Sequence, residues 1–160
     1  MLEAIFMFAA TVPAAEIDLD PTIPGTIEFE TSIEHNKELL ALLCSEMEVR
    51  KFDPPQMPVA RESHNQIDCR GFEFLGKPRL AEFVFADDQL KLVWILVNPD
   101  EREPVVAAMR AAYQSEGLAS ELVIGFPKHR TAWRNEPTEV LFYAESVAPF
   151  FESVFGKRDD

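Results

Sequence analysis

Two apolar segments joined by a pair of aspartates constrain the fold of this chain more than any other feature. Residues 80–86 read LAEFVFA and residues 89–97 read QLKLVWILV, and both are rich in β-branched and aromatic side chains. Asp87 and Asp88 lie between them, and a two-residue connection flanked by such segments is typical of a β-hairpin. Because residues 89–97 are almost wholly apolar after Lys91, this strand is expected at the centre of a sheet, covered on both faces or shielded by a helix.

Further segments have the composition of strands or the periodicity of helices. Thr31 and Glu34 have the spacing of a capping box, in which each side chain satisfies a free backbone amide of the first helical turn. Residues 105–112 place apolar side chains at i, i+3, i+4 and i+7, and Gly117 is expected to end that helix in a left-handed conformation. The expected strands are 67–75, 121–126 and 138–144, the expected helices are 32–45, 100–116 and 146–155, and the proline-rich segment 53–65 is expected to be an irregular connector.

The order of these elements defines the expected fold class. Strand, strand, helix occurs twice, at 80–116 and at 121–156, in pattern and not in residue identity. We therefore expect an α+β fold, with an antiparallel sheet of about five to six strands and two to three helices packed on one face. A chain of 160 residues allows one such domain, which we place at residues 32–160, after an extended acidic segment at residues 16–31.

The N-terminal residues resemble the remnant of a signal peptide. Residues 4–15 read AIFMFAATVPAA, an uncharged run of the length of a signal-peptide hydrophobic region, and Val12 and Ala14 are small enough for an A-x-A-like cleavage site. One part of the pattern is missing, because Glu3 stands where positive charge is expected. We predict that residues 1–15 are such a remnant; the alternative is an apolar strand or helix that packs in the core.

The two cysteines, Cys44 and Cys69, bear on the same question. In an exported protein an even number of cysteines predicts a disulfide, and this one would close a loop of about 26 residues, which stabilises the fold by about 3.5 kcal/mol in the chain-entropy model. In a cytosolic protein both would be buried free thiols. A zinc site that also uses His35 and His64 has no supporting spacing, so no metal site is predicted.

Charge is unevenly distributed along the chain. The formal net charge is -13, which disfavours nucleic acid and anionic lipid as partners because like charges repel at long range. Residues 16–48 hold nine acids and one base, whereas residues 49–79 hold six bases and four acids. Residues 16–48 form either a solvated face or a docking surface for a basic partner, such as a basic protein of the bacterial envelope.

No motif predicts a catalytic residue or a cofactor. The chain lacks GxSxG, GxGxxG, a P-loop, HExxH and a calcium-binding loop. Glu73, Glu82 and Glu139 lie inside expected strands, and alternation places Glu82 on the face opposite Phe83 and Phe85, where it should meet solvent. A general acid would need burial, for which the sequence gives no indication.

The best candidate ligand-binding cluster lies late in the chain. It combines cationic or hydrogen-bonding donors with a flat ring, and it consists of Lys128, His129, Arg130, Trp133 and Arg134. The alternative for Trp133 is that it covers an edge of the sheet. Trp94 lies in the most apolar strand and is expected in the core.

These features predict a non-catalytic binding or interaction domain of the bacterial envelope, periplasmic or secreted. The pattern resembles small bacterial envelope proteins of mixed α+β type, including periplasmic inhibitors and assembly factors, a likeness that implies no particular activity. The alternatives are an enzyme of unrecognised type and a cytoplasmic structural or regulatory subunit. No apolar run approaches 18 residues, so no transmembrane helix is expected, and the oligomeric state is left open.

Overall fold

The computed structural model describes residues 19–155, and the expected signal-peptide remnant at residues 1–15 lies outside this range. In the described part of the chain eight strands form one sheet, in the order β1-β2-β3-β4-β8-β7-β6-β5. All neighbouring strands are antiparallel. The α+β class is therefore confirmed, but the sheet is larger than the five to six strands that the sequence predicted.

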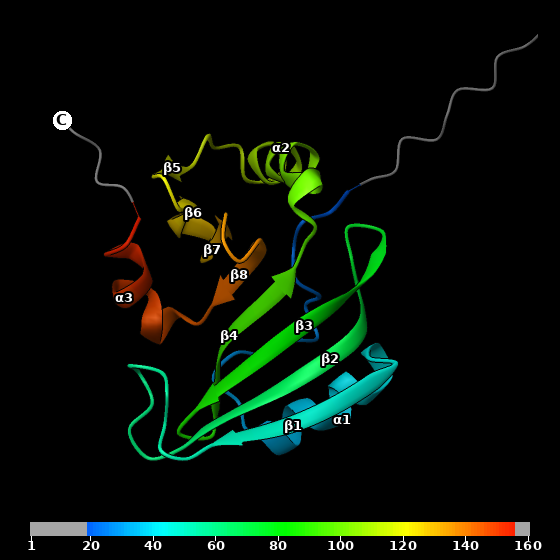
Figure 1. Cartoon of the computed structure of the whole chain (residues 1–160), viewed down its shortest axis with the longest axis vertical. Coiled ribbons are helices and arrows are strands. Elements are labelled where there is room, and N and C mark those ends of the chain that lie inside the picture. Colours follow the sequence, from blue (N-terminus) through cyan, green and yellow to red (C-terminus); the bar gives the residue numbers. More distant parts are fainter. Residues whose placement is uncertain (1–18, 156–160) are drawn as a thin grey trace, which may run out of the picture.

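Helices and strands follow one another in an order that occurs twice. The first series is α1 (Ile33–Leu43), β1 (Glu46–Phe52), β2 (His64–Phe74), β3 (Lys77–Ala86) and β4 (Gln89–Leu96), and the second is α2 (Arg102–Tyr113), β5 (Leu118–Ala119), β6 (Val123–Phe126), β7 (Thr131–Arg134) and β8 (Glu139–Tyr143), followed by α3 (Ala148–Glu152). Each series is a helix followed by a four-stranded meander, and the two meet where β4 pairs with β8 (Figure 1). The repeated unit is thus longer than the strand-strand-helix unit expected from the sequence.

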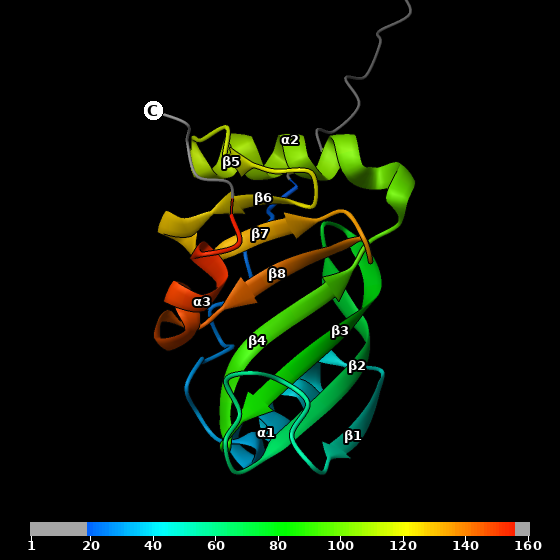
Figure 2. The ribbon, with the colours of Figure 1, turned by 60° about the vertical axis from the view of Figure 1, so that its left-hand side comes forward.

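The helices do not all pack on one face, which corrects the second part of the fold prediction. Apolar side chains of α1 and α2, such as Leu40 and Met109, belong to the same core cluster as Phe83 and Trp133. On the opposite face, Phe151 of α3 contacts the rings of Trp94 and Tyr143, at centroid distances of 6.4 and 5.4 Å. Figure 2 shows α3 apart from α2, on the other side of strands β6 to β8.

Strand alternation explains why the sheet needs cover on both sides. In β4, Val93 and Ile95 point to the α1 and α2 face, whereas Leu92 and Trp94 point to the α3 face. Because β4 lies between β3 and β8, none of its edges is free. The prediction that residues 89–97 form a central strand is confirmed.

The β3–β4 hairpin forms as expected, and its turn also holds other segments in place. Asp87 and Asp88 both have left-handed backbone angles, with φ of 51° and 60°. The Asp87 carboxylate accepts hydrogen bonds from three consecutive backbone amides of the connector before β2, at residues 61–63. Asp88 Oδ1 accepts one from Ile33 N at the start of α1, at 3.2 Å. The two aspartates therefore tie two loops to one turn.

Two details of the helix ends differ from the sequence prediction. The N-cap of α1 is Ser32, whose hydroxyl accepts a hydrogen bond from His35 N, so Thr31 and Glu34 form no capping box. The hydroxyl of Thr31 instead donates to the backbone oxygen of Glu28. Gly117 is left-handed as expected, with a φ of 78°, but α2 ends earlier, at Tyr113, because Gln114 is already left-handed.

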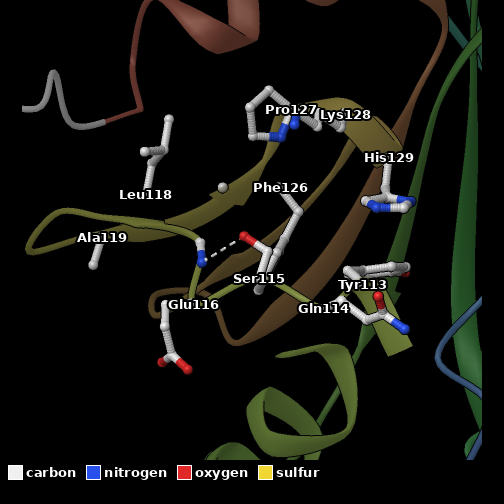
Figure 3. Close-up of a pocket in the computed structure, with 12 residues that line it drawn as sticks. Tyr113, Gln114, Ser115, Glu116, Leu118, Ala119, Phe126, Pro127, Lys128 and His129 are labelled. Carbon is white, nitrogen blue, oxygen red and sulfur yellow. Dashed lines mark hydrogen bonds between the residues drawn. The ribbon is translucent and has the colours of Figure 1, made fainter. Parts of the chain in front are cut away.

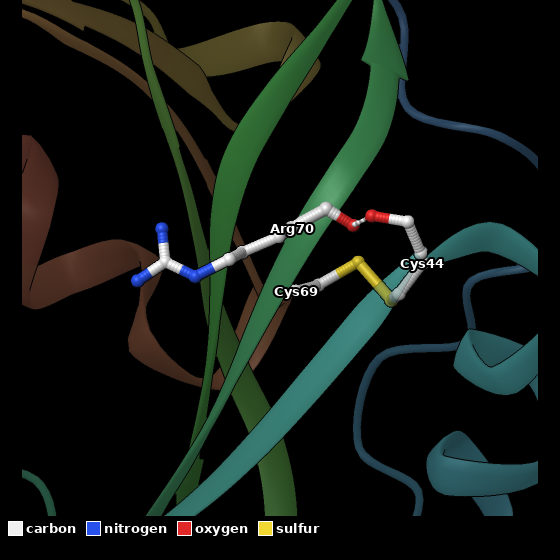
Figure 4. Close-up of a disulfide and its surroundings, with 4 residues drawn as sticks. Cys44, Cys69 and Arg70 are labelled. Carbon is white, nitrogen blue, oxygen red and sulfur yellow. Dashed lines mark hydrogen bonds between the residues drawn. A yellow bond between two sulfur atoms is a disulfide. The ribbon is translucent and has the colours of Figure 1, made fainter.

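The disulfide prediction is confirmed. Cys44, directly after α1, is bonded to Cys69 in β2, and the sequence separation is 25 residues (Figure 4). Cys69 is fully buried, and Arg70 points away from the bond toward the other face of the sheet. The bond fixes the end of α1 against the second strand of the sheet.

An ion pair joins the two series of elements. Arg79 in β3 donates to both carboxylate oxygens of Glu101, which lies at the start of α2, at 2.8 and 3.1 Å. Lys77 donates to the same carboxylate from a more exposed position. These hydrogen bonds lower the pKa of Glu101 to about 2. The β2–β3 hairpin is in this way held to the first turn of α2.

Candidate ligand-binding site

The clearest cavity in the described residues lies at the C-terminal end of α2. It has a volume of about 580 Å³ and is bounded by the turn after α2, by β5 and β6, and by the 3-10 turn η2 (Pro127–His129) (Figure 3). Cavities that bind small organic molecules have volumes of roughly 300–1,000 Å³. The cavity is thus of a size that suits a small ligand.

The chain leaves α2 in a way that opens this space. Gln114 N and Ser115 N donate back to the carbonyl groups of Ala111 and Arg110, which closes the helix. Gly117 then takes a φ of 78°, and an added Cβ would lie 2.7 Å from a methyl group of Ile124. Only glycine fits there without displacing the neighbouring strand. The turn therefore runs close to β6, and it forms one wall of the cavity.

Aromatic rings form the inner wall. Tyr113 stacks on His129 with a centroid distance of 4.5 Å, and it packs at an angle against Phe126 at 5.2 Å (Figure 3). The hydroxyl of Tyr113 donates to Pro21 O at 3.1 Å. Burial raises the pKa of Tyr113 to about 12, so the phenol stays neutral. Tyr113 therefore contributes ring surface to this wall and no charge.

The rim of the cavity is positively charged on one side. Within residues 19–155, neither Lys128 nor Arg130 forms an ion pair. The one acid of the lining, Glu116, pairs with Arg110 at 3.4 Å, and its carboxylate points away from Pro127 and Lys128 (Figure 3). Lys128 and the exposed ring of His129 are left as donors at the mouth.

The structure brings together two of the five residues of the predicted cluster. Lys128 and His129 line the cavity. Arg130 is exposed and does not line it. Trp133 is 1% exposed and packs in the core, where its Nε1 donates to Asn135 Oδ1 at 2.8 Å. Strand alternation in β7 then sends Arg134 to the opposite face of the sheet from Trp133.

Arg134 belongs to a second polar cluster, on the α3 face of the sheet. Its guanidinium lies 4.0 Å from the ring centroid of Trp94, and it forms an ion pair with Glu139. Nearby, Arg50 contacts the carboxylates of Asp68 at 2.9 Å and Glu82 at 3.8 Å. The cluster thus runs across the sheet from β1 to β8 and β7.

Two carboxyl groups of this cluster have raised pKa values. Burial is the largest cause for both Glu82 and Glu139, and each also feels a neighbouring carboxylate. Glu82 lies on the face expected from alternation, but it is half-buried there because arginine and tryptophan side chains surround it. Neither acid lines any of the three cavities described for residues 19–155. Their contacts connect neighbouring strands, which is a structural role.

Other kinds of site are not seen in the described part of the chain. No group of three or more histidine, cysteine or acidic side chains is placed to hold a metal ion among residues 19–155. Over the same range, no helix has both the length and the apolar character needed to span a bilayer. The cavity is the best-formed feature that could take a ligand.

Sequence reasoning missed most of the cavity lining. Residues 100–116 were assigned to a helix that ends at Gly117, and residues 121–126 to a strand, so the convergence of these segments was not foreseen. The one available signal was that Gly117, Gly125 and Pro127 come shortly before Lys128 and Arg130 in the sequence. Small residues and proline at the ends of short elements leave room beside the backbone.

Comparisons of the chain with protein families, with curated proteins and with solved structures gave no match. The functional argument therefore rests on the cavity and its surroundings.

Proposed function

We propose that this protein is a non-catalytic binding domain, whose cavity takes a small ligand with an apolar or aromatic body and one anionic group. The observation that carries the proposal is a cavity of about 580 Å³ with an aromatic inner wall and an unpaired lysine, Lys128, among the described residues at its mouth. Such a combination of apolar lining and a few polar groups is typical of small-molecule sites.

The lining determines which part of the ligand enters. Leu118, Ala119, Phe126 and Pro127 offer apolar surface, and the stacked rings of Tyr113 and His129 extend it. Burial of an apolar body against such surface contributes about 25 cal/mol per Å². The inner part of the site therefore favours a hydrocarbon or ring system over a compact, fully charged ion.

The charge at the mouth determines the polar end of the ligand. The whole protein carries a net charge of -13, which repels anions at long range. Lys128 offsets that field locally, because Glu116, the only acid among the described lining residues, pairs with Arg110. A single carboxylate, sulfonate or phosphate group next to Lys128 would be stabilised, and its binding should weaken as salt is added.

The disulfide supports an oxidising compartment as the place of action, outside the cytoplasm in the bacterial envelope or in secretion. Disulfides persist in exported proteins and are rare in the cytosol. The Cys44–Cys69 bond and the signal-like residues 1–15 agree with each other in this respect. Binding of a basic envelope protein by the acidic residues of 16–48 stays a separate prediction.

The ligand-binding proposal is tested with anilinonaphthalene sulfonate (ANS), which joins an aromatic body to one anionic group. We expect saturable fluorescence enhancement under native conditions, with a Kd on the order of 10–100 µM. Lys128→Glu should weaken binding by about tenfold or more, because the change removes an attraction and adds a repulsion. The thermal midpoint of unfolding should stay the same, since Lys128 is exposed.

The matched control is Lys51→Glu, which makes the same charge change at an exposed position of β1, on the first series of elements. This variant should bind ANS as the unmodified protein does. Equal weakening of ANS binding in both variants would show that the net charge of the protein, and not Lys128, causes the effect. The absence of saturable ANS binding would overturn the proposal. Near-UV circular dichroism separates site binding from ANS uptake by loosely packed protein.

The compartment is tested on protein isolated from its native source. We expect N-terminal sequencing to give a mature chain that starts near Glu16, and thiol titration of the denatured, unreduced protein to give no free thiol. A chain that starts at Met1 and has two free thiols would contradict the envelope assignment without affecting the ligand-binding test.

A further inference from the structure

No strand of the described residues pairs with the outer edge of β1. Strand β1 is the terminal strand of the sheet, and within residues 19–155 its only strand partner is β2. Its seven residues correspond to about 23 Å of backbone, whereas β5 at the other end of the sheet has only two residues. A long edge strand leaves backbone N–H and C=O groups able to pair with another strand.

Apolar side chains stand exposed along this edge. Met47 and Val49 are 36% and 49% exposed, although their partners in β2, Cys69 and Ile67, are fully buried. On the other face of the same strand, Glu48 lies opposite Asp68, a residue of the same charge. In the described structure Glu48 forms no ion pair. The edge therefore presents apolar surface beside a carboxylate that has no cation.

We propose that β1 pairs with β1 of a second copy of this chain, antiparallel and centred on Val49, to form a two-fold symmetric dimer with a continuous sheet. A two-fold axis perpendicular to the sheet pairs residues whose side chains lie on the same face. Because side chains alternate along a strand, one residue at the axis must then lie directly opposite the same residue of the other copy.

An axis at Glu46 or Phe52, the ends of β1, would pair only that one residue of the strand with its copy, and the charges select among the other five positions. An axis at Glu48, Arg50 or Lys51 would place that residue directly opposite its own copy. An axis at Met47 would place Glu46 opposite Glu48. Each of these registers contains a pair of like charges, which destabilises a strand pair.

The register centred on Val49 contains no such pair. Val49 faces Val49, Glu48 faces Arg50 of the other copy on both sides of the axis, and Glu46 faces Phe52. Arg50 is available for this contact because its side chain is 40% exposed even while it contacts Asp68. The dimer thus gives Glu48 a cation, which it lacks among the described residues of its own chain.

The dimer should be weak. Two strands that meet only along their edges bury less surface than the roughly 1,200–2,000 Å² of a stable interface. We expect sedimentation velocity to show monomer at about 10 µM and mostly dimer at about 500 µM. Glu48→Arg should stay monomeric over the whole range, because the introduced arginine meets Arg50 of the other copy.

The matched control is Glu46→Arg, which makes the same charge change on the same face of the same strand. In the proposed register the introduced arginine faces Phe52, so this variant should dimerise as the unmodified protein does. Unmodified protein that stays monomeric up to about 500 µM would overturn the proposal, and so would dimerisation of Glu48→Arg.

Oxidative cross-linking tests the register independently. Both native cysteines are in the disulfide, so one introduced cysteine supplies the only free thiol. Val49→Cys should form a covalent dimer, because directly opposite Cβ atoms in an antiparallel pair lie about 4.5–5.5 Å apart. Met47→Cys, on the same face, lies about 13 Å from its copy and should not cross-link. Equal cross-linking of both variants, or of neither, would contradict this register.

Discussion

The two halves of the sheet share an order of elements but differ in construction. In the first half, strands β1 to β4 have 7, 11, 10 and 8 residues, and a disulfide fixes α1 to β2. In the second half, β5 to β8 have only 2, 4, 4 and 5 residues, and both cysteines belong to the first half. The second half carries the cavity.

The lengths of helix and strand also differ between the two halves. Helix α2 has 12 residues and is about 18 Å long, whereas β6 has four residues and is about 13 Å long. The helix is therefore longer than the strand, and the cavity lies at its last turn, beside β5 and β6. In the first half, α1 has 11 residues and is about 16 Å long. The strands against which it packs are at least as long as the helix. We infer that the first half supplies stability and the second half supplies binding.

Removal of the disulfide should have the largest effect on stability. Replacement of both Cys44 and Cys69 by alanine frees a loop with a sequence separation of 25 residues. We expect the free energy of unfolding to fall by about 3.5 kcal/mol, measured by urea denaturation. At temperatures where the variant is folded it should still bind ANS, because the cavity lies in the other half. Loss of binding in the folded variant would show that the halves do not divide these roles.

Loss of the ion pair between the halves should rank second. Arg79→Met leaves the half-buried carboxylate of Glu101 without its buried partner, which we expect to cost about 2 kcal/mol. Lys77→Met removes only the exposed partner of the same carboxylate and should cost under about 1 kcal/mol. An equal loss of unfolding free energy in Arg79→Met and Lys77→Met, measured by urea denaturation, would show that the burial of Arg79 does not strengthen the pair.

The same pair predicts a dependence on acid. The pKa of Glu101 is lowered from 4.5 to about 2 in the folded protein. As the pH falls, the Glu101 carboxylate is therefore protonated in the unfolded state before it is protonated in the folded state. The stabilisation is therefore complete above about pH 4.5 and is lost as the pH falls toward 2. In Arg79→Met the dependence of stability on pH over this range should be much reduced, and an unchanged dependence would contradict the assignment.

A substitution in the wall of the cavity should have a moderate effect. Gly117→Ala places a Cβ 2.7 Å from Ile124 at a positive φ, which we expect to cost about 1–2 kcal/mol in thermal unfolding. Gly25→Ala is the control, because an added Cβ there meets nothing within 4 Å. A stability of Gly117→Ala equal to that of the control would show that the turn after α2 is loosely held.

The smallest effect concerns His64 in the first half. Its ring is buried against Phe52, its Nδ1 accepts a hydrogen bond from Gln56 N, and burial lowers its pKa. Because the unfolded state binds the proton more readily, stability should be complete above about pH 6.5 and should fall as the pH drops below it. The protection factor of the Gln56 amide against hydrogen exchange should fall over the same interval. His64→Phe should abolish the dependence of stability on pH in this interval, and persistence of that dependence in the variant would exclude His64 as its source.

The sequence predicted those parts of the fold in which local pattern and burial agree. The hairpin around Asp87 and Asp88 and the Cys44–Cys69 bond fall in this class. Strand β1 was missed because its sequence, EMEVRKF, is mostly charged, although Met47 and Val49 alternate with polar residues. An edge strand buries little, so its composition resembles that of a surface loop.

The candidate site was predicted only in part. Lys128 and His129 do lie at the cavity, but Trp133 and Arg134 belong to β7, a strand that was not expected. Once those residues form a strand, alternation separates them. The facing wall, around Tyr113, lies on a different element, and its convergence with η2 depends on tertiary packing that no local pattern encodes.

The division of roles between the halves is tested most directly by a ¹H–¹⁵N NMR titration of the full chain with ANS. The account predicts that shifted amides are confined to residues 113–119 and 125–129 and their immediate neighbours, and that β1, β2 and β3 are unaffected at constant protein concentration. Shifts centred on the first half of the sheet, or on the cluster around Glu82 and Glu139, would contradict it.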